Sequence, residues 1–263
     1  MSRGRSARAA ALLLAALGIP ACQENGSSGL LSAEVRSRVQ RAVAPVGAVD
    51  AASRASGDAV VESGNPLSEA PSFSSAVTLT VDLAQPRYPG SYGVLNVAAA
   101  GEVSSNGGTG VADYKVDVAA ATDLTFVDGV SGAIVTIPQG ARWRYRLEIA
   151  WTWTDADQWT LTATASGSLR RFAFRLLDEG ETIEGMLEED RQEAWTRQES
   201  AGVLASSLHL GADCSVLWTD AGGTQAVSIK VVDVDAISIS VDGTTFGPLT
   251  RLQLQVVFGV YWP

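Results

Sequence analysis

Several stretches of the chain alternate apolar and polar residues with a period of two. Residues 77–83 place Val and Leu at every second position, with Thr and Asp between them. Residues 237–241 repeat the pattern and lead into Asp242-Gly243, a dipeptide suited to a two-residue hairpin turn. Residues 252–262 alternate in the same way near the end of the sequence. Because this period is typical of antiparallel strands with one buried face, we predict strands in all three segments.

The pattern is strongest in residues 143–153, where Trp, Tyr, Leu and Ile occupy one face and Arg, Glu and Thr occupy much of the other. A short acidic turn leads from this segment into a second alternating run. Keeping the two apolar faces together requires Trp153 opposite Trp159 and Ile149 opposite Ala163. A slip of one residue would turn a whole apolar face toward water, so the sequence predicts this register.

The pattern predicts two features after this pair of strands. Gly167-Ser168 fits a two-residue turn into a third strand at residues 172–176. Residues 181–199 then lose the period of two and carry acids early and arginines late, as a helix prefers, although Gly185 costs such a helix about 1 kcal/mol. We interpret 181–199 as a possible helix.

These elements predict one all-β domain over residues 76–263. The favoured fold is an antiparallel β-sandwich, jelly-roll-like, with the one possible helix at 181–199. The alternative is a curved half-barrel closed by that helix. Either architecture suits a domain of this length.

Residues 22–75 differ in composition, being dominated by Ser, Ala, Gly and Pro. Such a stretch has few large apolar side chains with which to offset its chain entropy, so we predict a flexible tether. One short helix is expected within it, capped by Ser32 and stopped by Pro45.

The first 21 residues carry Arg3, Arg5 and Arg8, then a short apolar run, then the sequence Ile19-Pro20-Ala21-Cys22. The run is too short to span a bilayer, so we interpret residues 1–21 as a cleaved export signal. Its end resembles the lipobox of bacterial lipoproteins. That resemblance implies cleavage before Cys22, lipidation of Cys22 and a place in the cell envelope. Gln23 is not the Asp that retains some lipoproteins at the inner membrane, so the outer membrane is expected.

Net charge narrows the range of partners. Removal of three arginines with the signal would change the formal charge from −10 to −13. Such a protein lacks the basic surface that nucleic acid requires, and it gains nothing electrostatically from anionic lipid. Any membrane partner is therefore expected to be held through the N-terminal lipid, with more than one acyl chain for a lasting hold.

Cys22 and Cys214 are the two cysteines of the chain. If Cys22 is acylated, no disulfide can join them, and Cys214 is expected to be buried as a small hydrophobe. If Cys22 keeps its thiol, a Cys22–Cys214 disulfide becomes possible.

Catalytic residue types are scarce. His209 is the one histidine, it lies between two leucines, and no G-x-S-x-G sequence is present to supply a nucleophilic serine. One histidine and one available thiol also cannot build a zinc site without several carboxylates. We therefore expect no cofactor and no catalytic residue, and we interpret His209 as an outward residue of a strand.

Carboxylates provide two weaker candidate sites. Asp155 and Asp157 flank the tip of a predicted hairpin, where they could bind Ca²⁺ or simply form a solvated turn, the favoured interpretation. Glu148 lies on the charged face of its strand and is the best member of a possible glycosidase pair, with no partner evident. The tryptophans of the neighbouring apolar face are expected to be buried rather than available for sugar stacking.

Three classes of function remain open. The first, which we favour, is a lipid-anchored envelope protein with a non-enzymatic binding or structural role toward a protein or glycan. The second is a carrier of a lipid or other hydrophobic ligand, and the third is a carbohydrate-binding or carbohydrate-active domain. Fold analogy does not decide among them, because such folds host unrelated activities.

Overall fold

The structure, a computed structural model, describes residues 32–64, 71–86, 88–129, 131–155, 158–200, 203–220, 222–233 and 235–259. For residues 191–197 and 203–211 it describes the backbone alone. The elements in chain order are α2 (Ala33–Ser63), β1 (Ala76–Asp82), β2 (Ser91–Tyr92), β3 (Val94–Asn106), β4 (Thr109–Ala120), β5 (Leu124–Val127), β6 (Ile134–Ile137), β7 (Arg142–Asp155), β8 (Gln158–Asp178), β9 (Glu181–Ser200), β10 (Val203–Asp220), β11 (Gly223–Asp233), β12 (Ala236–Val241), β13 (Thr244–Leu249) and α3 (Arg251–Phe258).

The strands form one large sheet in which every pair is antiparallel. Its main path runs β1-β3-β4-β7-β8-β9-β10-β11-β12-β13, and β2, β5 and β6 form a branch joined through β6 to the second half of β8. Within the described chain β1 and β13 lie at opposite ends of this path, so the sheet stays open. The predicted all-β antiparallel, sandwich-like class is confirmed.

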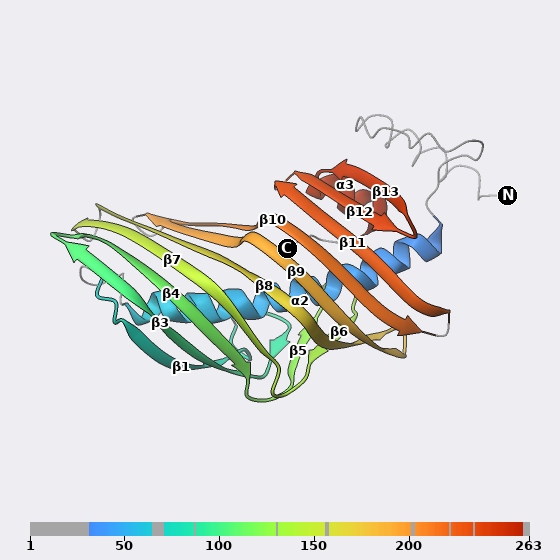
Figure 1. The fold of residues 1–263 in the computed structure, drawn as a ribbon, viewed down its shortest axis with the longest axis horizontal. Coiled ribbons are helices and arrows are strands. Elements are labelled where there is room, and N and C mark those ends of the chain that lie inside the picture. Colours follow the sequence, from blue (N-terminus) through green and yellow to red (C-terminus); the bar gives the residue numbers. More distant parts are fainter. Residues whose placement is uncertain are drawn as a thin grey trace.

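Helix α2 covers the inner face of this sheet, defined here as the face that carries Trp143 and Tyr145. Figure 1 shows the helix crossing the strands, from the end that holds β12 and β13 toward the end that holds β1. A helix of 31 residues is about 46 Å long, and ten strands about 4.8 Å apart span about 43 Å, so α2 is long enough to cross the whole path. The inner face and α2 together form the core.

The prediction of a tether over residues 22–75 is therefore wrong for Ala33–Ser63. Ser32 caps the helix as predicted, accepting a hydrogen bond from the Val35 amide at 3.1 Å, but the helix continues through Pro45. Its buried side chains are mostly Ala, Val and Ser, which are small enough to let the helix axis approach the sheet closely. The same small residues made the segment look too poor in apolar surface to fold. It folds because the sheet supplies the large side chains.

The predicted register of the central strands is confirmed. Trp153 lies opposite Trp159 and Ile149 lies opposite Ala163 in the β7–β8 pair. The ring centroids of the two tryptophans are 6.4 Å apart, in a stacked arrangement. Alternating residues of β7 are buried on the inner face and exposed on the other, which we call the outer face.

The predicted turn at Gly167-Ser168 is wrong. Strand β8 continues through it to Asp178, with irregularities in its pairing to β9 near Gly167 and again between Leu169 and Phe172. The second irregularity restores Phe172 to the inner face, because an extra residue resets which side chains point inward. The bent strand replaces the two shorter strands that the glycine suggested.

Residues 181–199 form strand β9, so the predicted helix there is wrong. The strand is hydrogen-bonded to β8 on one side and to β10 on the other. Ile183, Leu187 and Glu189 are buried on the inner face, which follows the period of two. Pairing on both sides outweighs the helix-like charge pattern. The alternative architecture had this segment closing the sheet, whereas α2 covers it instead.

The segment after β13 also differs from its prediction. Residues 251–258 form helix α3 rather than a strand, and residues 260–263 lie outside the described residues. Thr250 and Gln253 form a capping box, and Gly259 ends the helix in the left-handed conformation. These end signals outweigh the alternating pattern. The preceding hairpin turn at Asp242-Gly243 is confirmed, with φ of 51° and 80°.

Candidate functional site

Charged side chains line the outer face where β4 and β7 run side by side. Arg146 lies opposite Lys115 in the register, and Arg144 lies opposite Asp117. The Arg144 side chain pairs with Asp117 at 2.5 Å, while Arg146 reaches diagonally to Asp113. The result is a ladder of alternating charge across two strands.

Arg146 is the most strongly paired of these groups. Its Nε and Nη2 donate to the two carboxylate oxygens of Asp113 at 2.8 and 2.7 Å, and Nη2 also lies 3.0 Å from Glu148. The hydrogen bond from Arg146 lowers the pKa of Asp113, and the same contact raises the pKa of Arg146. Such bidentate pairing fixes where the guanidinium lies. Lys115, opposite it, adds a further positive charge.

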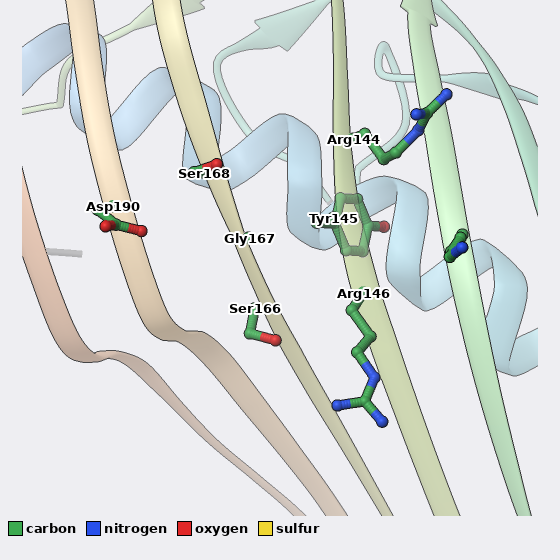
Figure 2. A pocket seen from close by; sticks show the side chains of 8 residues that line it. Arg144, Tyr145, Arg146, Ser166, Gly167, Ser168 and Asp190 are labelled. Carbon is green, nitrogen blue, oxygen red and sulfur yellow. The ribbon is translucent and has the colours of Figure 1, made fainter.

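A shallow hollow of about 560 Å³ opens beside this ladder on the outer face (Figure 2). Its walls come from four neighbouring strands, with three cations on β4 and β7, two serines on β8 and one carboxylate on β9. The lining residues are Lys115, Arg144, Tyr145, Arg146, Ser166, Gly167, Ser168 and Asp190. The hollow therefore has three cations on one side, of which Arg144 and Arg146 are paired with carboxylates of the ladder, hydroxyls in the middle and Asp190 on the other side.

Gly167 lines the hollow and lies opposite Tyr145, where strands β7 and β8 approach each other closely. A Cβ added there would lie 3.0 Å from both the Cα and the Cβ of Tyr145 and 3.1 Å from the carbonyl oxygen of Arg144. The Tyr145 side chain passes to the inner face, where its hydroxyl lies 2.7 Å from Ser56 Oγ and donates to the Ser53 carbonyl at 3.2 Å. The strand under the hollow is thus tied directly to α2.

The lining offers groups that can bind a polar ligand. Lys115, Arg144 and Arg146 are cations, Ser166 and Ser168 carry hydroxyls, and Asp190 is a carboxylate. Cations and hydroxyls together suit a polar ligand that carries an anionic group, and Asp190 suits an amine or further hydroxyls. The volume lies within the range of small-ligand sites.

Glu148 is exposed on the outer face, beside Arg146. Its side chain is 52% exposed, and its described ion pair is the one with Arg146. Asp113, the neighbouring carboxylate, is held by that same guanidinium. Two carboxylates sharing one arginine on an open face lack the cleft in which a glycosidase holds its acid and its nucleophile.

The calcium candidate is placed in part. Asp155 ends β7, while Asp157 lies outside the described residues. Among the side chains that the structure describes, no group of three His, Cys, Asp or Glu is arranged to hold a metal ion. Cys22 and the side chain of His209 are likewise outside the described part of the chain.

Two predictions about buried residues are confirmed. Cys214 is 4% exposed on the inner face of β10, where the register places it opposite Glu189. Trp143, Trp151 and Trp159 are buried, and Trp153 is partly buried against the core; none of these four lies on the outer face. Their burial places these four rings away from the outer hollow.

A cluster around Arg41 was missed by the sequence prediction, because the residues are far apart along the chain. Arg41 on α2 contacts Asp178 at 2.9 Å and Glu181 at 3.0 Å, both at the β8–β9 turn, and Asp220 at 3.7 Å. Burial opposes the charge of Arg41, but the hydrogen bond and charge of Asp178 outweigh it and raise the pKa of Arg41. The cluster ties the helix to the strand ends.

Comparisons of the chain with protein-family models, with curated proteins and with solved structures gave no match. Neither α2 nor α3 is both long and apolar enough to cross a membrane, and they are the two helices in the part of the chain that the structure describes.

Proposed function

We propose that this protein is a lipid-anchored cell-envelope protein with a non-enzymatic binding role, and that the outer hollow between β4, β7, β8 and β9 is its binding surface. The observation that carries the proposal is the polar lining of that hollow, with Lys115, Arg144 and Arg146 on one wall and Asp190 on the other. The anchor rests on the lipobox-like sequence that ends at Cys22, with the outer membrane as the expected location.

The ligand class follows from the lining. A phosphate or carboxylate group would lie against the cationic wall, hydroxyls would meet Ser166 and Ser168, and an amine would face Asp190. An anionic amino sugar or a similar polar glycan unit has all three groups. Because the hollow is shallow and open, we expect a dissociation constant of about 1 mM for a single unit.

A role as carrier of a hydrophobic ligand is less favoured than the binding of a polar ligand in the outer hollow. Such a ligand would have to lie against the inner face of the sheet, and α2 already buries 16 of its residues there. Making room would expose valines such as Val39, Val46 and Val60, which are fully buried. Exposing each of these valines would cost on the order of 1.5–3 kcal/mol of hydrophobic free energy.

The binding test uses the two lysines of the chain as a matched pair. Lys115 lines the hollow, whereas Lys230 is exposed on β11, outside the lining. Glucosamine 6-phosphate would be titrated into the purified protein and followed by NMR chemical-shift changes. We expect Lys115→Ala to weaken binding by about two- to fivefold, the value of one exposed charge contact, and Lys230→Ala to leave it unchanged.

Controls separate specific from diffuse binding. Inorganic phosphate and glucosamine, titrated separately, should each bind more weakly than the combined molecule, because each meets one wall of the hollow. Equal effects of the two lysine variants, or no shifts near Ser166 and Ser168, would refute the hollow as the binding surface.

The anchor is tested separately. Mass spectrometry of the protein recovered from bacterial membranes should show an acylated N-terminal cysteine, and Cys22→Ser should abolish that mass and the membrane retention. An unmodified N-terminus that still begins at Met1 would refute the anchoring proposal.

A further inference from the structure

Helix α3 presents an apolar pair to solvent. Leu254 and Phe258, four residues apart, are fully buried, and the Phe258 ring packs edge-on against Phe246 with centroids 5.6 Å apart. Leu252 and Val256, also four residues apart, are 58% and 40% exposed. The helix is therefore apolar on two faces, and one of them is uncovered in the described structure.

The position of α3 suggests what covers this face. Gln40 on α2 donates from Nε2 to the Phe258 carbonyl at 3.0 Å, so α3 lies beside the start of α2. Gln40 is eight residues after the helix cap Ser32, a rise of about 12 Å along the axis. Figure 1 shows α3 near the dark-blue beginning of α2, at the end of the sheet that holds β12 and β13.

The segment between Cys22 and Ser32 is short. Ser32 follows Cys22 by ten residues, a distance that even a fully extended chain cannot make longer than about 35 Å. If Cys22 carries the lipid, the bilayer surface lies within about 35 Å of Ser32. Helix α3 is at the same end of the fold as Ser32.

We infer that the exposed face of α3, made by Leu252 and Val256, is a second contact with the lipid bilayer, which sets how the anchored domain is oriented. This inference rests on the proposed lipid anchor. The anchor holds the protein at the membrane, and two aliphatic side chains alone would bind too weakly to do so. Together they would place the β12–β13 end toward the lipid and leave the outer hollow accessible from the side.

The test labels single exposed positions of the full-length, membrane-extracted protein. Leu252→Cys carries an environment-sensitive fluorophore on α3, and Asn106→Cys carries it at the β3–β4 turn, at the other end of the fold (Figure 1). Labelling is done on the folded protein, in which Cys214 is buried. Unchanged circular dichroism confirms that both labelled variants keep the fold.

Each labelled protein is reconstituted into vesicles of phosphatidylethanolamine and phosphatidylglycerol with lipid-borne quenchers. We expect a blue-shifted emission at position 252 and quenching about twofold stronger than at position 106, because only α3 enters the interface. Adding Val256→Ser to the Leu252→Cys protein should reduce the difference in quenching between positions 252 and 106.

The outcomes separate the two proposals. Acylation confirmed by mass spectrometry together with equal, weak quenching at both positions would overturn the bilayer contact and leave the anchor standing. A blue shift at 252 without lipid quenching would mean that protein covers the face, which also overturns it. A chain without acylation at Cys22 would overturn the anchor itself.

Discussion

Gly185 offers a direct test of whether residues 181–199 form a strand or a helix. In the structure a Cβ at Gly185 would lie 2.3 Å from the Phe174 ring and 2.7 Å from the Leu217 carbonyl oxygen. The ring can turn, but the carbonyl belongs to the backbone of β10, which at Leu217 is paired with β9 on one side and with β11 on the other. Gly185→Ala must therefore displace part of the ladder.

A strand and a helix at residues 181–199 predict changes of opposite sign in the stability of Gly185→Ala. Forcing a methyl group into a packed site costs about 1–3 kcal/mol. If 181–199 were a helix, the same substitution would stabilise the protein by about 1 kcal/mol, since alanine is the better helix former. For a domain of this size, the strand predicts a fall in Tm of about 2–12 °C.

Urea unfolding followed by tryptophan fluorescence measures the difference in the free energy of unfolding. Gly129→Ala is the matched control, because no atom lies within 4 Å of its added Cβ, and its stability should stay within about 0.5 kcal/mol of the parent protein. Unchanged or increased stability of Gly185→Ala would refute the strand assignment at this position.

Three further substitutions test other contacts. Tyr145→Phe removes the hydroxyl that lies 2.7 Å from Ser56 Oγ, and should cost about 1–2 kcal/mol in urea unfolding. Burial opposes ionisation of Asp220, but its hydrogen bonds and a neighbouring arginine outweigh this and lower its pKa below 3.8. The stability that ionised Asp220 contributes is fully present above pH 3.8, its pKa in the unfolded chain, and is lost as the pH falls through the lower pKa of the folded state. Asp220→Asn should therefore make the fall of the urea midpoint on acidification less steep. Thr250→Ala removes the capping box with Gln253 and should cost about 1 kcal/mol, with lost hydrogen-exchange protection in α3.

Each of these has a control on an exposed residue of the same type. Tyr92→Phe, at a side chain 55% exposed, should leave the free energy of unfolding unchanged. Asp235→Asn, at an exposed carboxylate, should leave the free energy of unfolding at neutral pH within about 0.5 kcal/mol of the parent protein. Thr224→Ala, on the outer face of β11, should not alter exchange in α3. A control that changes as much as its partner would contradict the assigned contact.

Part of the candidate site was predictable from sequence. Alternation along 143–153 places Arg144, Arg146 and Glu148 together on the face away from the tryptophans, and the structure agrees. The other wall was not predictable. Ser166 and Asp190 reach the hollow because β8 runs on past Gly167 and because residues near Asp190 form a strand, and both sequence predictions there were wrong.

The alternating pattern was enough to predict which faces of the central strands are buried and how β7 and β8 align. These are local properties: a short turn joins the strands, and a slip of one residue would expose the whole row that contains Trp153 and Trp159. The Asp242-Gly243 hairpin is equally local, because both residues must adopt positive φ.

The roles of α2, β9 and α3 depend on contacts with elements that are distant along the chain. The small side chains of α2 bury little surface alone, and become a core element because the sheet offers the large ones. Glu181–Ser200 is a strand because neighbours on both sides satisfy its backbone hydrogen bonds, whatever its charges favour. Residues 251–258 have a helix cap and an alternating pattern, and the packing of Phe258 on Phe246 stabilises the helix. A local pattern determines the structure where a wrong register would expose a whole row of buried side chains, as in β7 and β8. In α2, β9 and α3, the surface against which the segment packs determines it.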